Sequence, residues 1–169
     1  MAEVLLETRG LSKFFKAAGG LLHAVEDVDL ALGAGRTLGV VGESGCGKST
    51  LGRTVLRLEK PSAGQVLFRG EDISALGRRQ LRSARRDMQM VFQDPYSSLD
   101  PRMTVFDLVA EPLREICRGL PRAQARERVL DTMELCGLPA EYADSYPHEL
   151  DGGRRQRVGL ARAMVTEPK

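Results

Sequence analysis

The 169-residue sequence has no tryptophan, only 5% aromatic residues and only three cysteines. An odd number of cysteines, none at the spacing of a metal site, argues against both a disulfide framework and a zinc site. No apolar run approaches the roughly 18 residues that a membrane-spanning helix needs. The residues after Met1 also lack the basic and apolar segments of a signal peptide. Together these absences indicate a protein of a reducing cytoplasm.

An excess of basic charge is also missing. Lysine and arginine number 25 against 23 aspartates and glutamates, so the composition does not predict a nucleic-acid binder. The two histidines, His23 and His148, are isolated, and no metal site is expected from them. One basic cluster stands out, and it predicts either a solvated surface or a contact with lipid head groups or an acidic partner: Arg78, Arg79, Arg82, Arg85 and Arg86.

Hydrophobic patterning divides the chain into a strand-rich first part and a helix-rich second part. Strands are predicted at 4–11, 24–32, 37–41, 64–68 and 88–92, with a loop at 17–22. Helices are predicted at 48–58, from the N-cap Thr104 to about Cys117, at 122–136 before the helix stop Gly137, and at 152–165. The order predicts an α/β protein whose mixed sheet carries a helical insertion or an appended helical subdomain.

The strongest motif is a glycine-rich loop between a predicted strand and a predicted helix. It fits the phosphate-loop pattern G-x-x-x-x-G-K-[ST] at every fixed position, with Thr50 next in the chain: Gly42, Glu43, Ser44, Gly45, Cys46, Gly47, Lys48 and Ser49. Glycines let backbone amides surround phosphate groups, and the positive end of the following helix adds to the field. Lys48 would reach the β- and γ-phosphates, and the Ser49 hydroxyl would bind Mg²⁺. The motif alone predicts a nucleoside triphosphate, because GTPases, kinases, helicases and transport ATPases all use it.

Four landmarks together resemble the ATP-binding subunit of ABC transporters, over essentially the whole chain. They are Leu11-Ser12-Lys13-Phe14-Phe15, the phosphate loop, Val91-Phe92-Gln93-Asp94-Pro95, which is similar to the Q-loop, and Leu150-Asp151-Gly152-Gly153-Arg154, which is similar to the signature motif. The longer runs 42–53 and 91–102, with Tyr146-Pro147-His148-Glu149-Leu150, resemble the oligopeptide, dipeptide and nickel importers. The resemblance implies an α/β P-loop fold of the ABC type that binds ATP and Mg²⁺ and energises import of peptides or nickel.

The resemblance also implies roles for single residues. Phe15 would stack on adenine, with Phe14 as the alternative, although a buried aromatic at a strand end fits the pattern too. Val25 would flank the ribose, although a core valine fits equally well. Gln93 would contact Mg²⁺ or the attacking water, so that Lys48 and Gln93 are the catalytic candidates. The signature residues Asp151, Gly152 and Gly153 would face ATP held by a second ATP-binding subunit.

The same resemblance predicts the organisation of the protein. Residues 1–94 and 151–169 would form the nucleotide-binding core, and 95–150 a helical subdomain that docks on transmembrane permease subunits. The protein would then be cytoplasmic, peripheral on the inner face of the cell membrane. Two rivals stay open: an ABC-type ATPase without a membrane partner, and a catalytically degenerate nucleotide-binding subunit.

Two departures from the family pattern shape these expectations. The chain stops at Lys169, before the family's Walker B strand, catalytic glutamate and switch histidine. We therefore expect an N-terminal fragment that does not turn over ATP. We also expect the predicted strand at 37–41 to lack its neighbouring strand. Asp151 and Arg154 stand where the family has serine and glutamine, although aspartate is also a good cap for the helix predicted at 152–165. A carboxylate cannot donate a hydrogen bond to phosphate and repels it, which predicts a weak site within a heterodimer that has one competent site.

Overall fold

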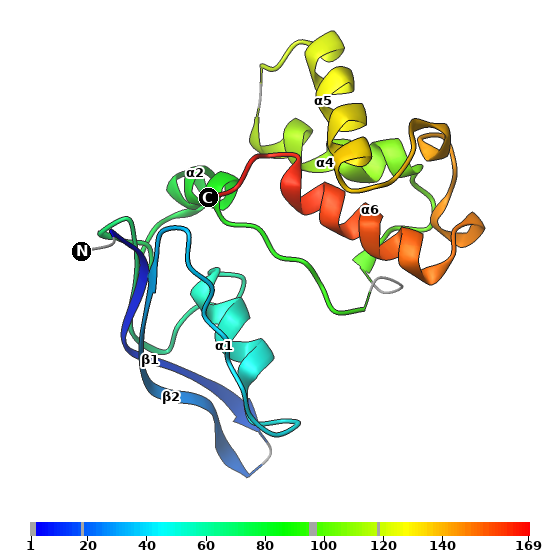
Figure 1. The fold of residues 1–169 in the computed structure, drawn as a ribbon. Helices are drawn as coiled ribbons and strands as arrows, with labels where there is room; N and C mark the ends of the chain where they lie inside the picture. Colours follow the sequence, from blue (N-terminus) through cyan, green and yellow to red (C-terminus); the bar gives the residue numbers. More distant parts are fainter. Residues whose placement is uncertain (1–2, 18, 95–97, 118) are drawn as a thin grey trace. The chain divides into compact units, whose positions relative to one another are not determined.

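The computed structural model describes residues 3–17, 19–94, 98–117 and 119–169. The chain forms two compact units, Met1–Ala84 and Arg85–Lys169, and each is described by itself (Figure 1). Residues 151–169 pack within the second unit, and their expected grouping with residues 1–94 remains a prediction. Within the described part of the chain, no helix combines the length and the apolar character needed to cross a membrane.

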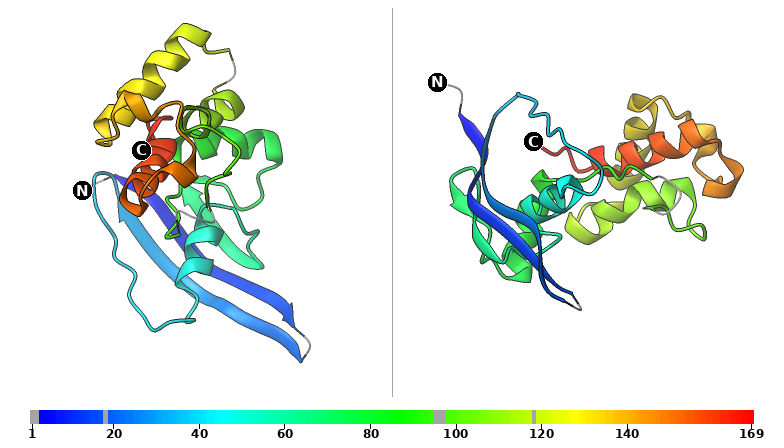
Figure 2. Two further views of the ribbon diagram at one scale, coloured as in Figure 1. Left: turned by 90° about the vertical axis from the view of Figure 1, so that its right-hand side faces the viewer. Right: turned by 90° about the horizontal axis from the view of Figure 1, so that it is seen from below.

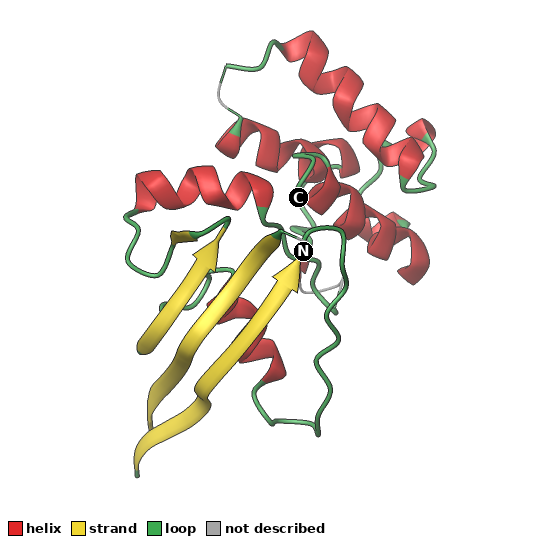
Figure 3. Cartoon of the chain, turned by 60° about the vertical axis from the view of Figure 1, so that its left-hand side comes forward, coloured by secondary structure: helices red, strands yellow, loops and turns green. Residues whose placement is uncertain are grey.

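The first unit is built on an antiparallel sheet with the strand order β2-β1-β3-β4 (Figure 3). β1 (Val4–Ala17) and β2 (Gly20–Gly33) form a long hairpin, β3 (Ala63–Phe68) pairs with the other edge of β1, and β4 (Glu71–Asp72) pairs with β3. The loop predicted at 17–22 is therefore wrong for most of its length. Leu22 pairs with Phe15 and Leu21 with Lys16, because ladder hydrogen bonds hold these residues in strand even where their side chains are exposed.

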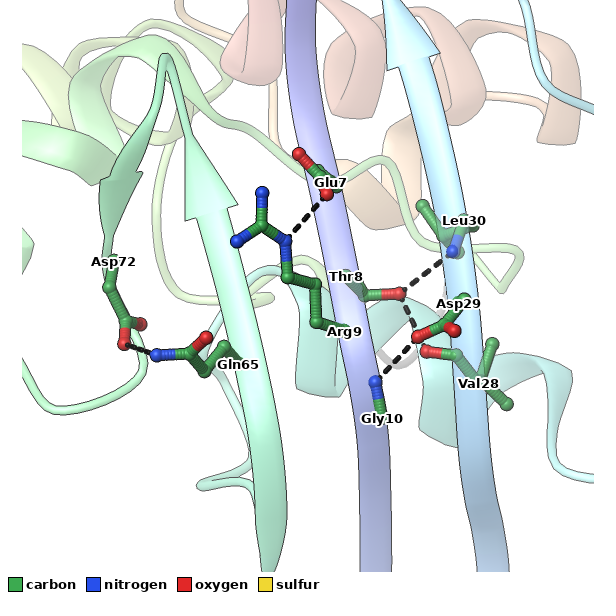
Figure 4. A network of polar contacts seen from close by, with 9 residues as sticks. All are labelled: Glu7, Thr8, Arg9, Gly10, Val28, Asp29, Leu30, Gln65 and Asp72. Atoms are coloured by element: carbon green, nitrogen blue, oxygen red, sulfur yellow. Dashed lines mark hydrogen bonds and ion pairs between the residues drawn. The ribbon is translucent and has the colours of Figure 1, made fainter.

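Side-chain hydrogen bonds replace ladder bonds where the pairing of β1 and β2 shifts register, between Thr8 and Leu11 (Figure 4). Thr8 is 1% exposed, and its hydroxyl donates to the Val28 carbonyl oxygen at 2.8 Å and accepts from the Leu30 amide at 3.1 Å. The Gly10 amide donates to the Asp29 carboxylate at 2.6 Å. The hairpin thus satisfies backbone groups that the irregular register would leave unpaired.

Two predicted strands, 37–41 and 88–92, do not form, so the expected parallel strand at 37–41 is wrong. Residues 36–43 are irregular, and the side chain of Val41 is 96% exposed. Residues 88–92 are also irregular, and Phe92 is exposed. An apolar, β-branched sequence favours extended backbone, but a strand also needs a hydrogen-bonding neighbour. Within the described residues neither segment pairs with another strand.

Helix α1 (Lys48–Val55) packs against β1 and β2 (Figure 3). It ends three residues before the predicted limit at Leu58, because the backbone reverses at Arg57, where φ is 54°. The Arg57 guanidinium is buried and donates to the Ile73 carbonyl oxygen at 2.9 Å. The core of this unit consists of apolar side chains from the sheet, α1, the segment before α2 (Arg78–Asp87) and α2 itself: Leu11, Val25, Val55, Val66, Phe68, Ile73 and Leu81.

The second unit is helical, as predicted (Figure 2). It contains α4 (Val105–Ile116), α5 (Arg122–Leu135) and α6 (Gly152–Met164), with two short 3₁₀ turns, η1 (Ala140–Tyr142) and η2 (Pro147–Glu149), between α5 and α6. The three α-helices bury one continuous apolar cluster, which includes Leu108, Val109, Val129, Met133 and Val158.

The predicted ends of α4 and α5 are confirmed. The Thr104 hydroxyl accepts from the Asp107 amide and caps α4. Gly137 has φ 70°, its amide donates to the Glu134 carbonyl, and the Leu138 amide donates to the Met133 carbonyl. These two bonds form a Schellman motif, which ends α5 at a glycine for the reason predicted from the sequence.

Candidate nucleotide site

The phosphate loop, residues 42–49, leads directly into α1. Gly47 is the N-cap of the helix with φ 94°, and no side chain caps the amides of the first turn. No acidic residue lies in that turn, so nothing there offsets the positive end of the helix dipole. Ser49 is exposed and Thr50 half-buried at the start of α1, while Glu43, Ser44, Gly45 and Cys46 are exposed in the loop. The loop therefore presents free backbone donors toward an anion.

The Lys48 ammonium is held within the loop. It donates to the Gly42 carbonyl oxygen at 2.8 Å and to the Glu43 carbonyl oxygen at 2.5 Å, and it lies 3.6 Å from the Cys46 sulfur. These bonds fold the lysine over the glycine-rich backbone, so its charge lies within the loop. An anion entering the loop would meet both a point charge and backbone N–H groups.

A hollow of about 310 Å³ opens beside the loop. Four of the predicted site residues line it, namely Val25, Cys46, Gly47 and Lys48, and Val25 is 7% exposed. The other lining residues were not predicted to belong to the site, and they come mostly from β2 and from the segment before the loop: His23, Ala24, Glu26, Val28, Val40, Val41 and Leu51. Their position follows from the pairing of β2 with β1, which no local motif reveals.

The loop and β2 approach each other so closely at one point that only glycine fits. A Cβ atom built on Gly47 would lie 2.1 Å from the Ala24 carbonyl oxygen. A Cβ on Gly42 would lie 2.7 Å from the Cys46 sulfur. The absence of side chains at these glycines therefore leaves the concave loop that a phosphate group requires. The exposed loop, its glycines and the uncapped start of α1 fit the phosphate groups of a nucleoside triphosphate.

The two candidate adenine-stacking residues differ in their contacts. The Lys13 ammonium lies over the Phe15 ring, 4.7 Å from the ring centroid. In the hairpin, Phe15 pairs with Leu22 of β2. The Phe14 ring packs on the His23 ring with centroids 4.4 Å apart, and His23 lines the hollow. Both roles therefore remain hypotheses, and the contact with His23 links Phe14 to the site.

Gln93 and the signature residues belong to the second unit. Gln93 is exposed on the irregular segment before residue 95. Pro95, Tyr96 and Ser97, which lie within the run 91–102 that is similar to the importers, are outside the described residues. Gly152 and Gly153 are exposed in the first turn of α6. No cluster of histidine, cysteine or acidic side chains capable of holding a metal ion occurs within the residues that the structure describes.

Asp151 is the N-cap of α6, as the sequence predicts. One carboxylate oxygen accepts from the Arg154 amide at 2.7 Å, and the other pairs with the Arg154 guanidinium at 2.6 Å. The bond from the Arg154 amide is the main cause that lowers the pKa of Asp151 below its ordinary value. The guanidinium also lies over the Tyr142 ring at 4.7 Å. The two residues that depart from the family pattern therefore form one ion pair, in which the carboxylate is ionised at neutral pH.

Comparison with known proteins shows the family of the chain. The sequence profile of ABC transporters matches residues 25–169. The chain is 46% identical to the oligopeptide transport ATP-binding protein OppF of Bacillus subtilis over 170 residues, which are 100% of this chain and 56% of that protein. It is also 46% identical to AppF of the same organism, covering 99% of this chain and 53% of that protein. The chain thus spans about half the length of the curated relatives it matches.

Solved structures give the same result for the fold. The dimeric structure of MJ0796, a bacterial ABC transporter cassette, superposes with a TM-score of 0.87 and 30% identity, over 96% of this chain and 70% of that chain. A post-hydrolysis state of the same cassette, bound to ADP and Pi, matches equally well. The predicted α/β cassette fold is thereby confirmed.

Proposed function

Because the chain belongs to the ABC transporter family, we propose that it is the nucleotide-binding part of a subunit that uses ATP to energise import of peptides. The observation that carries this proposal is the intact phosphate loop, in which Lys48 and the uncapped start of α1 border one hollow. The named relatives of OppF type favour peptides over nickel. The transported substrate itself would be selected by other subunits.

The residues of the loop have separate roles in this proposal. Lys48 and the first amides of α1 bind the β- and γ-phosphates, and Ser49 holds Mg²⁺ through its hydroxyl. When bound, Mg²⁺ would neutralise charge on the phosphate oxygens. Val25 packs beside the ribose, and Phe15 or Phe14 stacks on the base. Gln93 orients the attacking water, so catalysis rests mainly on positioning and on charge stabilisation.

The proposed partners follow from the same family. The helical unit would dock on transmembrane permease subunits, and a second ATP-binding subunit would close the nucleotide site with its own signature residues. No nucleic acid is proposed as a partner. The assembly would place this chain in the cytoplasm, on the inner face of the membrane.

Titration with a fluorescent ATP analogue tests the central role of Lys48. Lys48→Ala should abolish binding, because it removes the only lysine or arginine side chain in the described lining of the hollow. Arg53→Ala is the matched control, since Arg53 lies in the last turn of α1, away from the loop. Equal nucleotide affinity in wild type and Lys48→Ala, with unchanged folding, would overturn the assignment.

A second candidate, a subunit with a weakened signature site, is favoured by the ion pair of Asp151 and Arg154. Facing ATP held by an opposite subunit, the ionised carboxylate would repel phosphate, whereas serine would donate a hydrogen bond. The arginine offsets only part of this repulsion because the pair is exposed. Asp151→Ser should therefore raise ATP-driven dimerisation or turnover in the complete assembly.

Two substitutions at Asp151 separate its charge from its role as a helix cap. Asparagine and serine cap a helix about as well as aspartate does, so Asp151→Asn and Asp151→Ser both keep α6 intact while they remove the charge. If both variants lower turnover with unchanged thermal stability, Asp151 contributes to the active site and the weakened-site candidate is wrong.

A further inference from the structure

The stretch of chain that carries Gln93 begins at a point that is bound to the residues directly after α6. The Thr166 hydroxyl donates to the Arg86 carbonyl oxygen at 3.0 Å. The Lys169 amide donates to the Asp87 carbonyl oxygen at 3.0 Å. Thr166 is 1% exposed, so its hydrogen bond is shielded from competing water. The amino-terminal side of the Gln93 stretch is therefore tied to the end of α6.

The carboxyl-terminal side of the same stretch is bound to α6 by Arg162. This residue lies in the last turn of the helix, and its guanidinium donates to the Ser98 carbonyl oxygen at 2.7 Å. The next residue, Leu99, is 4% exposed and belongs to the apolar cluster of the helical unit. Both described ends of the Gln93 stretch are thus attached to the carboxyl-terminal part of one helix.

The Arg162 guanidinium is partly removed from water. Burial lowers the pKa of Arg162 below its ordinary value, while the charge of Glu111 on α4 acts in the opposite direction. Arginine keeps its charge in proteins, so the donor to Ser98 is a cation in a sheltered position. Hydrogen bonds from charged donors are stronger than neutral ones, and shelter from water strengthens them further. We therefore expect this bond to hold the Ser98 carbonyl in one position.

Arg157 makes a bond of the same kind from the same helix to a different part of the chain. Its guanidinium donates to the Gly137 carbonyl oxygen at 2.5 Å, just after the end of α5. Neither Arg157 nor Gly137 belongs to the Gln93 stretch. Arg157 is therefore a matched control for Arg162, with the same charge, the same type of acceptor and the same helix.

We propose that Arg162 is a positioning residue, which holds Gln93 in its working place by fixing the Ser98 carbonyl to α6. The proposal rests on the proposed function, in which Gln93 orients the attacking water. Asp151 caps the other end of α6, so one helix of about 20 Å joins the signature residues to the stretch that carries Gln93. Without the Arg162 bond, the backbone at Ser98 gains freedom, and Gln93 occupies its working place for a smaller share of the time.

Steady-state ATP turnover by the complete assembly tests the proposal. Arg162→Met keeps a long side chain without a donor, and it should lower kcat about tenfold, since the bond of a charged donor is lost. The KM for ATP should change less than about twofold, because the phosphate loop is untouched. Arg162→Lys restores a cationic donor and should recover most of the lost kcat, whereas Arg157→Met should leave kcat unchanged.

A double-mutant cycle shows whether Arg162 acts through Gln93. If it does, Arg162→Met should cost nothing further in kcat when it is combined with Gln93→Ala. Full additivity of the two losses, wild-type kcat in Arg162→Met, or no recovery in Arg162→Lys would each overturn the proposal. Wild-type kcat in Gln93→Ala is a different result, because it would overturn the role of Gln93 in the proposed function and the positioning role of Arg162 with it.

Amide hydrogen exchange on the 169-residue chain, without nucleotide, tests the same bond independently of turnover. The amides of residues 98–103 should exchange about tenfold faster in Arg162→Met than in wild type or Arg157→Met. Equal exchange in all three proteins would overturn the proposal even where ATP binding is confirmed. Thermal unfolding shows whether each variant folds, and the uncharged, shorter Arg162→Gln replaces Arg162→Met in both experiments if that variant does not fold.

Discussion

Gly47→Ala is the substitution for which the structure of the phosphate loop makes the sharpest prediction. An alanine Cβ at this position would lie 2.1 Å from the Ala24 carbonyl oxygen and 3.3 Å from its carbonyl carbon. Both neighbours are backbone atoms of β2, so no side chain can rotate away to make room. The added methyl also occupies a residue with φ 94°, a conformation that L-residues rarely adopt.

The expected cost combines two separable effects. Backbone strain at positive φ costs about 1–2 kcal/mol, and separating the loop from β2 adds lost packing, for a total of about 2–4 kcal/mol of unfolding free energy. Gly45→Ala isolates the first effect, because Gly45 has φ 82° but no atom within 4 Å of its added Cβ. Neither effect operates in Gly52→Ala, because Gly52 lies in α1 with open space around it. This variant should stabilise the chain by up to about 1 kcal/mol.

Urea denaturation monitored by circular dichroism measures the three unfolding free energies, and a fluorescent ATP analogue measures binding. Gly47→Ala should lose nucleotide binding, because moving the loop from β2 displaces the Lys48 ammonium and the first amides of α1 from the hollow. If Gly47→Ala and Gly45→Ala are equally stable, the contact with Ala24 is not rigid and the reasoning fails.

Two further predictions concern stability. Thr8→Val should lower the unfolding free energy by about 1–3 kcal/mol in urea denaturation, because it leaves the Val28 carbonyl and the Leu30 amide without their hydroxyl partner; Thr8→Ser keeps the hydroxyl, and an equal loss there would contradict this reading. The guanidinium of Arg114 holds the pKa of Asp107 below its ordinary value of 3.8. The ionised carboxylate therefore stabilises the folded state above pH 3.8, and this stabilisation is lost as the pH falls through the lower pKa of the folded state. Thermal unfolding between about pH 5 and 2 should depend less on pH in Asp107→Asn than in wild type, and identical profiles would refute the coupling.

Local chemistry predicted the ends of the helices well. Thr104 and Asp151 cap α4 and α6, and Gly137 ends α5, because each of these residues satisfies backbone groups within a few positions of itself. The residues of the phosphate loop can likewise be identified locally, since the helix amides and the Lys48 ammonium come from consecutive residues, although the contact of Gly47 with Ala24 of β2 is not local. Such features depend little on the rest of the fold, which is why a motif identifies them.

Features that need a distant partner were harder to predict. The hairpin of β1 and β2 extends through exposed residues such as Leu21, because its register depends on pairing rather than on hydropathy. The side chains that complete the nucleotide hollow, such as His23 and Ala24, were missed for the same reason.

The segment 37–41 shows most clearly what hydrophobic patterning does not predict. Its composition, Thr37-Leu38-Gly39-Val40-Val41, is that of a buried strand, yet Val40 and Val41 are exposed and the segment has no ladder in the described structure. Hydropathy indicates that a segment favours burial, but it does not indicate which strand would pair with it. A strand forms only when a neighbouring strand supplies hydrogen-bond partners. The phosphate loop follows this segment directly, but its shape does not depend on a ladder there, because Gly47 seats against Ala24 of β2 and the Lys48 ammonium bonds to the loop carbonyls. The phosphate-binding geometry is therefore set by β2, the loop and the start of α1, which are the elements that the Gly47 series perturbs.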